Sequence, residues 1–240
     1  TVNVTGGSYT SNGYNSPAVY STAAITVKNA KLTANNSESL VIEGKNSIAL
    51  ENCTVSGNMS STKGSSSLEN VHTVMIYQSM SGDADVGTSE FSMTGGSLIG
   101  KNGDLFYITN THCILTLSGV TLKNEDPDGY LLRVVGNSAS HGWGTAGSSF
   151  TGTINIVDNA EGGAAVSDNA VVTIGSGCTW TLTGDCTITL SPGSVRASTA
   201  ARIPETTQGS MSCCSAVTVR PWRRWKKPSM ASTAASLCSV

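Results

Sequence analysis

The sequence predicts an all-β solenoid of about seven to eight coils, followed by a non-repetitive C-terminal tail. An eight-residue pattern, apolar–x–apolar–x–Asn/Gly–x–x–apolar, recurs along the chain. It begins at Val2, Ile25, Ile48, Phe91 and Leu115, at intervals of 23, 23, 43 and 24 residues. A fixed period of this length indicates stacked repeats, because one repeat cannot bury its own apolar edge. Only 12% of the residues are charged, and no stretch combines a helical period with capping signals, so we expect almost no helix.

Each repeat is expected to contain two strands separated by a bend. The first three residues of the octet alternate apolar, polar, apolar, which is typical of a strand with one buried face. The fifth residue is always Asn or Gly, the types that adopt a left-handed backbone at lowest cost, so the chain should bend there. A second apolar strand follows in each repeat, predicted at residues 18–19, 40–42, 73–77, 105–108 and 131–134.

The identical order of residues within each repeat favours parallel pairing between neighbouring repeats, with strands about 4.8 Å apart. The alternative is a sandwich of antiparallel hairpins, which would need two-residue turns between alternating strands. Asn12-Gly13 and Asn102-Gly103 are such dipeptides, but neither separates two alternating runs. We therefore expect parallel strands.

Three insertions interrupt the period and are expected to form surface loops, which in solenoids often carry the binding function. They cover residues 57–70, 78–89 and 136–150. Beyond them the pattern shortens to apolar pairs at Ile154/Ile156, Val172/Ile174, Trp180/Leu182 and Ile188/Leu190.

Charge and composition divide the chain into a solenoid domain at residues 1–190 and an irregular tail at 191–240. The domain has seven Lys and Arg against fifteen Asp and Glu, a net charge of −8, whereas the tail has +6. The tail is either a basic arm that touches membrane or RNA, or a disordered or non-native end, and we favour the second. An acidic domain with one Arg argues against nucleic acid as a partner.

No apolar run approaches the roughly 18 residues of a transmembrane segment. The chain opens directly in a strand without a signal peptide, so we expect it to be part of a longer secreted protein. Its seven Cys include no metal-binding spacing. Four cysteines lie on or beside strands and are expected to be small core residues: Cys53, Cys113, Cys178 and Cys186. The sequence does not decide whether Cys178 and Cys186 form a disulfide.

Acidic residues form the first candidate site. Glu125, Asp126 and Asp128 surround a Pro-Asp-Gly turn and could hold Ca²⁺ through hard oxygen ligands. The alternative, which we favour, is a solvated turn. Asp83 and Asp85 lie in the preceding insertion, and a position on the same flank would strengthen the case for calcium.

Aromatic and basic residues form a candidate sugar site on the following repeat. Trp143 lies among glycines and is either a sugar-stacking platform, together with Tyr130 and Arg133, or a plug for a widened coil. Arg133 should point outwards from its strand, where it would suit an anionic polysaccharide. His72 and His112 border strands and are expected at the edge of the core. The candidate catalytic residues are Asp83, Asp85, Asp128, Arg133 and His141.

The octets at residues 25–32 and 48–55 resemble those of right-handed parallel β-helix proteins, the superfamily of pectate-lyase-like enzymes and bacterial surface adhesins. Residues 110–122 and 141–147 look like adhesin-like cell-surface β-helix proteins of gut Firmicutes. The resemblance implies a right-handed parallel β-helix at the bacterial cell surface that binds polysaccharide or another surface glycan. The alternatives are a polysaccharide lyase or glycoside hydrolase and, less favoured, a purely structural spacer or a flat, ice-binding type of surface that uses the Thr-rich residues 179–183 and 187–189.

Overall fold

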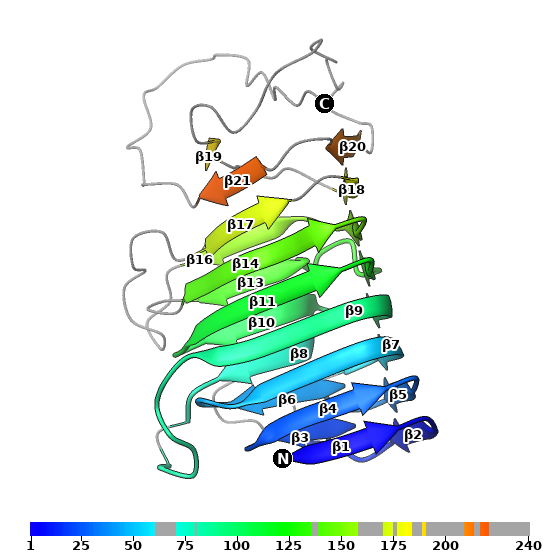
Figure 1. Ribbon diagram of the computed structural model, residues 1–240, viewed down its shortest axis with the longest axis vertical. Coiled ribbons are helices and arrows are strands. Elements are labelled where there is room, and N and C mark those ends of the chain that lie inside the picture. The colour runs from blue at the N-terminus through cyan, green and yellow to red at the C-terminus, as the bar shows by residue number, and fades with distance from the viewer. Residues whose placement is uncertain are drawn as a thin grey trace.

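The computed structural model describes residues 1–60, 71–79, 81–135, 139–157, 170–174, 177–183, 189–190, 209–213 and 217–220. Across these ranges every regular element is a β-strand, as predicted, and none is a helix. The described residues accordingly include no helix long and apolar enough to cross a membrane. The strands form a larger sheet of 15 strands and a smaller sheet of six, and Figure 1 shows the strands up to residue 174 arranged in chain order along the long axis.

The larger sheet has two parts, because each repeat enters it, bends and continues. The strands before the bend are β1 (Val2–Thr5), β4 (Ala24–Lys28), the first half of β7 (Ser47–Gly57), the first half of β9 (Ser89–Gly100), β11 (His112–Ser118), β14 (Ala139–Ala146) and β17 (Ala170–Ile174). The strands after the bend are β2 (Ser8–Ser11), β5 (Lys31–Ala34), the second halves of β7 and β9, β12 (Thr121–Asn124), β15 (Ser149–Thr151) and β18 (Cys178–Leu182).

The smaller sheet contains the predicted second strands, and it lies behind the pre-bend strands in Figure 1. Its strands are β3 (Val19–Ser21), β6 (Leu40–Glu43), β8 (His72–Tyr77), β10 (Asp104–Thr109), β13 (Leu132–Val135) and β16 (Ile154–Val157). All of these strands pair in parallel with their neighbours. The antiparallel sandwich is therefore excluded for this part of the chain.

The register confirms the octet residue by residue. Val2 pairs with Ile25, Ile25 with Ile48, Ile48 with Phe91, and Phe91 with Leu115. These are the five predicted octet starts, so the interval of 43 residues contains one repeat with insertions rather than two repeats. The two sheets with parallel pairing at a fixed register are consistent with a β-solenoid.

The predicted bends are also confirmed. The fifth octet residues Gly6, Asn29, Asn52, Gly95 and Gly119 have φ of 75°, 53°, 52°, 66° and 61°. All five lie in the left-handed region that only Gly and Asn visit readily. The choice of residue at this position is thus explained by backbone conformation.

The core lies between the two sheets and consists of the inward octet residues and the inward residues of the smaller sheet. Phe91 packs edge-on against Phe106 of the smaller sheet, with ring centroids 5.4 Å apart. Cys53, Cys113 and Cys178 are buried free thiols, as expected of small core residues. Burial raises the pKa of Cys113, which keeps this thiol protonated. Cys186 lies outside the described residues.

The expected excursion at residues 136–150 is wrong in its main part. Residues 139–146 form strand β14, which pairs in parallel with β11 and β17. The octet was hidden because Gly142 and Gly144 occupy the inward positions held by Leu115 and Leu117 in the preceding repeat. Trp143 therefore lies on a strand of the larger sheet, not on a loop.

Strand direction changes only where two strands of the tail join the larger sheet, within the part of the chain that the structure describes. β21 (Val217–Arg220) pairs antiparallel with β17 and with β19 (Thr189–Leu190), and β20 (Gly209–Cys213) pairs antiparallel with β18. The parallel arrangement therefore describes the solenoid domain and not the tail.

Candidate functional site

The post-bend strands present an outward surface that we call the hydroxyl face. It consists of two rows of side chains in register from one repeat to the next. The first row is Ser8, Lys31, Thr54, Ser97, Thr121, Ser149 and Thr179, and the second is Thr10, Thr33, Ser56, Ile99, Lys123, Thr151 and Thr181.

The hydroxyl face is accessible and carries no carboxylate in either row. All its residues are exposed or half-buried. Within the described residues, its Ser and Thr hydroxyls make no hydrogen bond to another protein group, and Lys123 pairs with Glu125 at 2.9 Å. The pre-bend strands differ, because their outward residues include the ion pair of Lys28 with Glu51 at 2.5 Å. Among the outward faces of the larger sheet, the hydroxyl face is therefore the one without acidic positions.

A second group of polar residues lies at the start of the smaller-sheet strands, and we call it the charged row. Glu38, His72 and Asp104 each stand two residues before the first inward residue of their strands, and His72 and Asp104 are register partners. His72 Nε2 lies 3.1 Å from Glu38 Oε1, and its ring stacks on Tyr107 at a centroid distance of 4.9 Å. The Nδ1 atom of His72 is buried without a hydrogen-bond partner.

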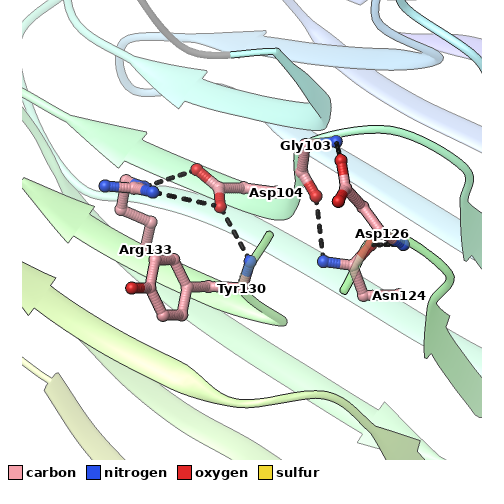
Figure 2. A network of polar contacts seen from close by, with 6 residues as sticks. All are labelled: Gly103, Asp104, Asn124, Asp126, Tyr130 and Arg133. Carbon is pink, nitrogen blue, oxygen red and sulfur yellow. Dashed lines mark hydrogen bonds and ion pairs between the residues drawn. The ribbon is translucent and has the colours of Figure 1, made fainter. Parts of the chain in front are cut away.

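Arg133 contacts the charged row through Asp104, and Figure 2 shows this pair. Its Nε donates to Asp104 Oδ2 at 2.5 Å, and its guanidinium lies 4.7 Å from the centre of the Tyr130 ring. The backbone N–H of Tyr130 donates to the other oxygen of Asp104 at 2.8 Å. Arg133 is 19% exposed and Asp104 only 2%, so this is a largely buried ion pair.

Burial and charge shift the two carboxyl groups of the charged row in opposite directions. Burial raises the pKa of Asp104, and the hydrogen bond and charge of Arg133 oppose this only in part. Burial also acts to raise the pKa of Glu38, but the hydrogen bond and charge of His72 outweigh it and lower that pKa. Perturbed groups of this kind often mark functional sites, although buried structural networks produce them too.

A smaller cluster lies at the opposite end of the smaller-sheet strands. The Tyr20 hydroxyl donates to Glu43 and lies 2.6 Å from the Tyr77 hydroxyl. Burial, followed by the hydrogen bond to Glu43, raises the pKa of Tyr20, and burial raises the pKa of Tyr77. Tyr20 is 44% exposed whereas Glu43 is buried, so only the aromatic part of this cluster faces solvent.

The proposed calcium ligands belong to a turn in which the Asp126 carboxylate accepts hydrogen bonds from backbone N–H groups (Figure 2). Asp126 accepts from the N–H groups of Gly103, at 2.6 Å, and Asp128, at 3.0 Å. Glu125 pairs with Lys123. Among the described residues no three His, Cys, Asp or Glu side chains are grouped to hold a metal ion. Calcium at this turn stays a prediction.

The two acidic loops do not share a flank. Asp83 and Asp85 are exposed and follow β8, and the backbone oxygen of Asp85 accepts from the N–H of Lys45. Residues 125–128 precede β13, at the other end of the smaller-sheet strands. A strand of five to six residues separates these ends by about 17–20 Å, so the loops cannot supply one cation or one acid–base pair.

The sugar-site candidates are also divided between the sheets. Tyr130 and Arg133 contact each other at the smaller sheet. Trp143 and His141 lie on β14 of the larger sheet, in register with Thr116 and Ile114. The side chains of Trp143 and His141 lie outside the described residues, and His112, on β11, is exposed.

Sequence reasoning missed three partners of the predicted residues: Glu38, Asp104 and Tyr107. Aligning the second strands of the repeats would have placed Glu38, His72 and Asp104 at one position, which is the signal that was available. The parallel sheets are compatible with a parallel β-helix. Comparison with known proteins finds no matching family model, no matching curated protein and no matching solved structure.

Proposed function

We propose that residues 1–190 form a right-handed parallel β-helix that binds extracellular glycan as an adhesin-like module of the bacterial cell surface. The hydroxyl face is the observation that carries this proposal. Its two rows run in register across the post-bend strands and offer accessible donors and acceptors with no carboxylate between them.

The chemistry of the hydroxyl face suits sugars. A Ser or Thr hydroxyl donates one hydrogen bond and accepts two, and a Lys ammonium donates three. A sugar hydroxyl has the same dual capacity, so a glycan can pair with many of these groups at once. The solenoid domain is acidic overall, but neither row contains an acidic residue, and Glu125, which lies beside the second row, is paired with Lys123. This limits the electrostatic repulsion between the face and an anionic sugar.

The positions of the candidate catalytic groups favour binding over turnover. A general acid and base must both reach the scissile bond, which requires carboxyl groups within about 10 Å of each other. Asp83 and Asp85 lie at the opposite end of the smaller-sheet strands from Asp128. Arg133 is held by Asp104 and Tyr130 rather than by an acidic loop.

Retention on a panel of immobilised plant and host polysaccharides tests the proposal, with parallel assays for new reducing ends and for unsaturated products. We expect retention of the folded protein by at least one glycan with neither product formed. Trp143→Ala and Asp128→Ala should both retain this binding, because neither residue belongs to the hydroxyl face. If the protein degrades a glycan and Asp128→Ala abolishes this activity, the protein is an enzyme and the binding-only proposal is wrong. Retention by none of the glycans would also refute the proposal.

A further inference from the structure

The hydroxyl face is periodic in two directions. Successive side chains of one row are about 4.8 Å apart, and the two rows are about 6.7 Å apart, because alternate residues of a strand share a face. Each row continues through seven repeats without a change of register. Figure 1 shows β2, β5 and the post-bend ends of β7 and β9 lying one beside the next along the long axis.

Single contacts on this face contribute little. A hydroxyl that bonds to a sugar gives up a bond to water, so the net gain per contact is small. Neither row contains an aromatic residue that would add stacking, and Ile99 is its only apolar side chain. The free-energy cost of the translational and rotational freedom that a small sugar loses on binding exceeds the gain from a few such contacts. Binding therefore needs a ligand that makes many contacts for one loss of freedom.

We propose, resting on the glycan-binding function above, that the ligand is the ordered surface of a crystalline polysaccharide rather than a soluble or disordered chain. In an ordered polymer the hydroxyl groups repeat at fixed positions and are already immobile. Binding therefore causes little further loss of conformational entropy in the ligand. A flexible chain would have to be ordered along the whole face.

Ice also presents a periodic array of hydrogen-bonding groups, and the two lysines argue against it. Lys31 and Lys123 are exposed and lie within the rows themselves. A Lys ammonium is a strongly hydrated, mobile charge, which disturbs an ordered water layer. The same group can donate up to three hydrogen bonds to sugar oxygens. The composition of the rows therefore favours a polysaccharide surface.

Sedimentation with insoluble polymers tests the inference on the full chain. The probes are microcrystalline cellulose and chitin, the same polymers after swelling to the amorphous form, and their soluble oligosaccharides. We expect the protein to bind at least one crystalline polymer at least tenfold more tightly than its amorphous form, and to ignore the oligosaccharides. Tighter binding to the amorphous or soluble forms would overturn the inference while leaving glycan binding intact. Binding to no glycan in any form would remove the proposed function as well.

Matched variants locate the surface. Thr54→Glu with Thr121→Glu places two carboxylates on the first row, and Thr94→Glu with Thr116→Glu places two on the outward surface of the pre-bend strands, all at exposed Thr positions. The first pair should weaken crystalline binding at least tenfold and the second less than twofold. Thr54→Ala with Thr121→Ala removes the same hydroxyls without adding charge, in case the Glu pair does not fold. Equal effects of the two Glu pairs, or ice growth inhibition lost in the first pair, would overturn the inference.

Discussion

Glycine serves two distinct purposes at the bends of the larger sheet. Gly119 has φ +61° and no atom within 4 Å of an added Cβ, so it is required only for its backbone conformation. Gly96 has φ +84°, and an added Cβ would lie 2.0 Å from the backbone oxygen of Cys53. Substitution at Gly96 therefore adds a steric clash to conformational strain.

We predict that Gly96→Ala lowers the free energy of unfolding more than Gly119→Ala does. Left-handed strain alone should cost Gly119→Ala about 1–2 kcal/mol. Gly96→Ala should exceed this, because the backbone of β7 must move to admit the methyl group. Urea unfolding of both variants measures the difference. Gly119→Asn is the control and should lose less than Gly119→Ala, since Asn29 and Asn52 hold the same conformation. Equal losses in the two Ala variants would contradict the clash.

Glu38 predicts an acid-dependent term in stability. Its pKa is lowered from the ordinary 4.5, so its charged form is favoured in the folded state. The resulting stabilisation is fully present above about pH 4.5 and is lost as the pH falls through the lower folded pKa. Glu38→Gln cannot titrate and should lack this loss. Unfolding free energies measured from pH 6 to pH 2 should therefore converge between the two proteins at the acid end.

The contribution of Asp104 to the pH dependence of stability must be distinguished from that of Glu38, because the pKa of Asp104 is shifted in the opposite direction. Its raised pKa means that the charged form is disfavoured by folding, and this penalty is relieved as the pH falls through the folded pKa. Asp104 is present in both the wild type and Glu38→Gln, so its contribution cancels in their difference. A difference that stays constant with pH would show that Glu38 does not titrate as described.

At the scale of elements, the ion pair between β10 and β13 shows which feature of Arg133 the sequence predicts and which it does not. The sequence predicts an outward Arg133, yet its partner Asp104 lies 29 residues earlier and just before an apolar run. Nothing local marks Asp104 as a partner. Only the register of the smaller sheet brings the two strands together, so the pair could not be predicted from spacing along one strand.

We predict that Arg133→Ala destabilises the fold more than Asp104→Asn does. Removing Arg133 leaves the buried Asp104 carboxylate without its counter-charge, which typically costs about 3–5 kcal/mol when a buried pair is broken. The Asn side chain of Asp104→Asn keeps one oxygen, which can still accept from the Tyr130 N–H, and the Arg133 charge left without a partner is 19% exposed to water, so less should be lost. Urea unfolding at pH 7 compares the two variants, with Lys101→Ala as an exposed control. A larger loss in Asp104→Asn would show that the Arg charge, not the Asp charge, needs compensation.

The failure at β14 has a different cause. The octet predicts strands wherever apolar residues hold the inward positions, and this rule is confirmed for β1, β4, β7, β9 and β11. Gly142 and Gly144 hold the inward positions of β14, so the apolar signal disappears although the backbone still pairs. Sequence periodicity reports which side chains are buried, and a strand can keep its hydrogen bonds without them.

For the whole molecule, the core is a row of inward residues in which each member packs between those of adjacent repeats. Tyr9, Leu32, Val55, Leu98 and Leu122 hold one inward register position. Tyr9 belongs to the first repeat and is 43% exposed, whereas Leu98 is fully buried. Stability in such a molecule is approximately a sum of repeat terms and contacts between neighbouring repeats. Truncating an inward side chain to Ala should therefore lower the free energy of unfolding by an amount that depends on the position of that residue in the row.

We predict that Leu98→Ala lowers the free energy of unfolding by about 2–5 kcal/mol, since it leaves a cavity between two repeats. Tyr9→Ala should cost about 1 kcal/mol or less, because 43% of its surface is already exposed to water. Urea unfolding gives both values. Native-state hydrogen exchange adds a spatial test, because the amides of β7, β9 and β12 should lose protection first in Leu98→Ala. Uniform loss of protection from β1 to β15 would mean that the domain unfolds as one unit, and that stability does not divide among its repeats.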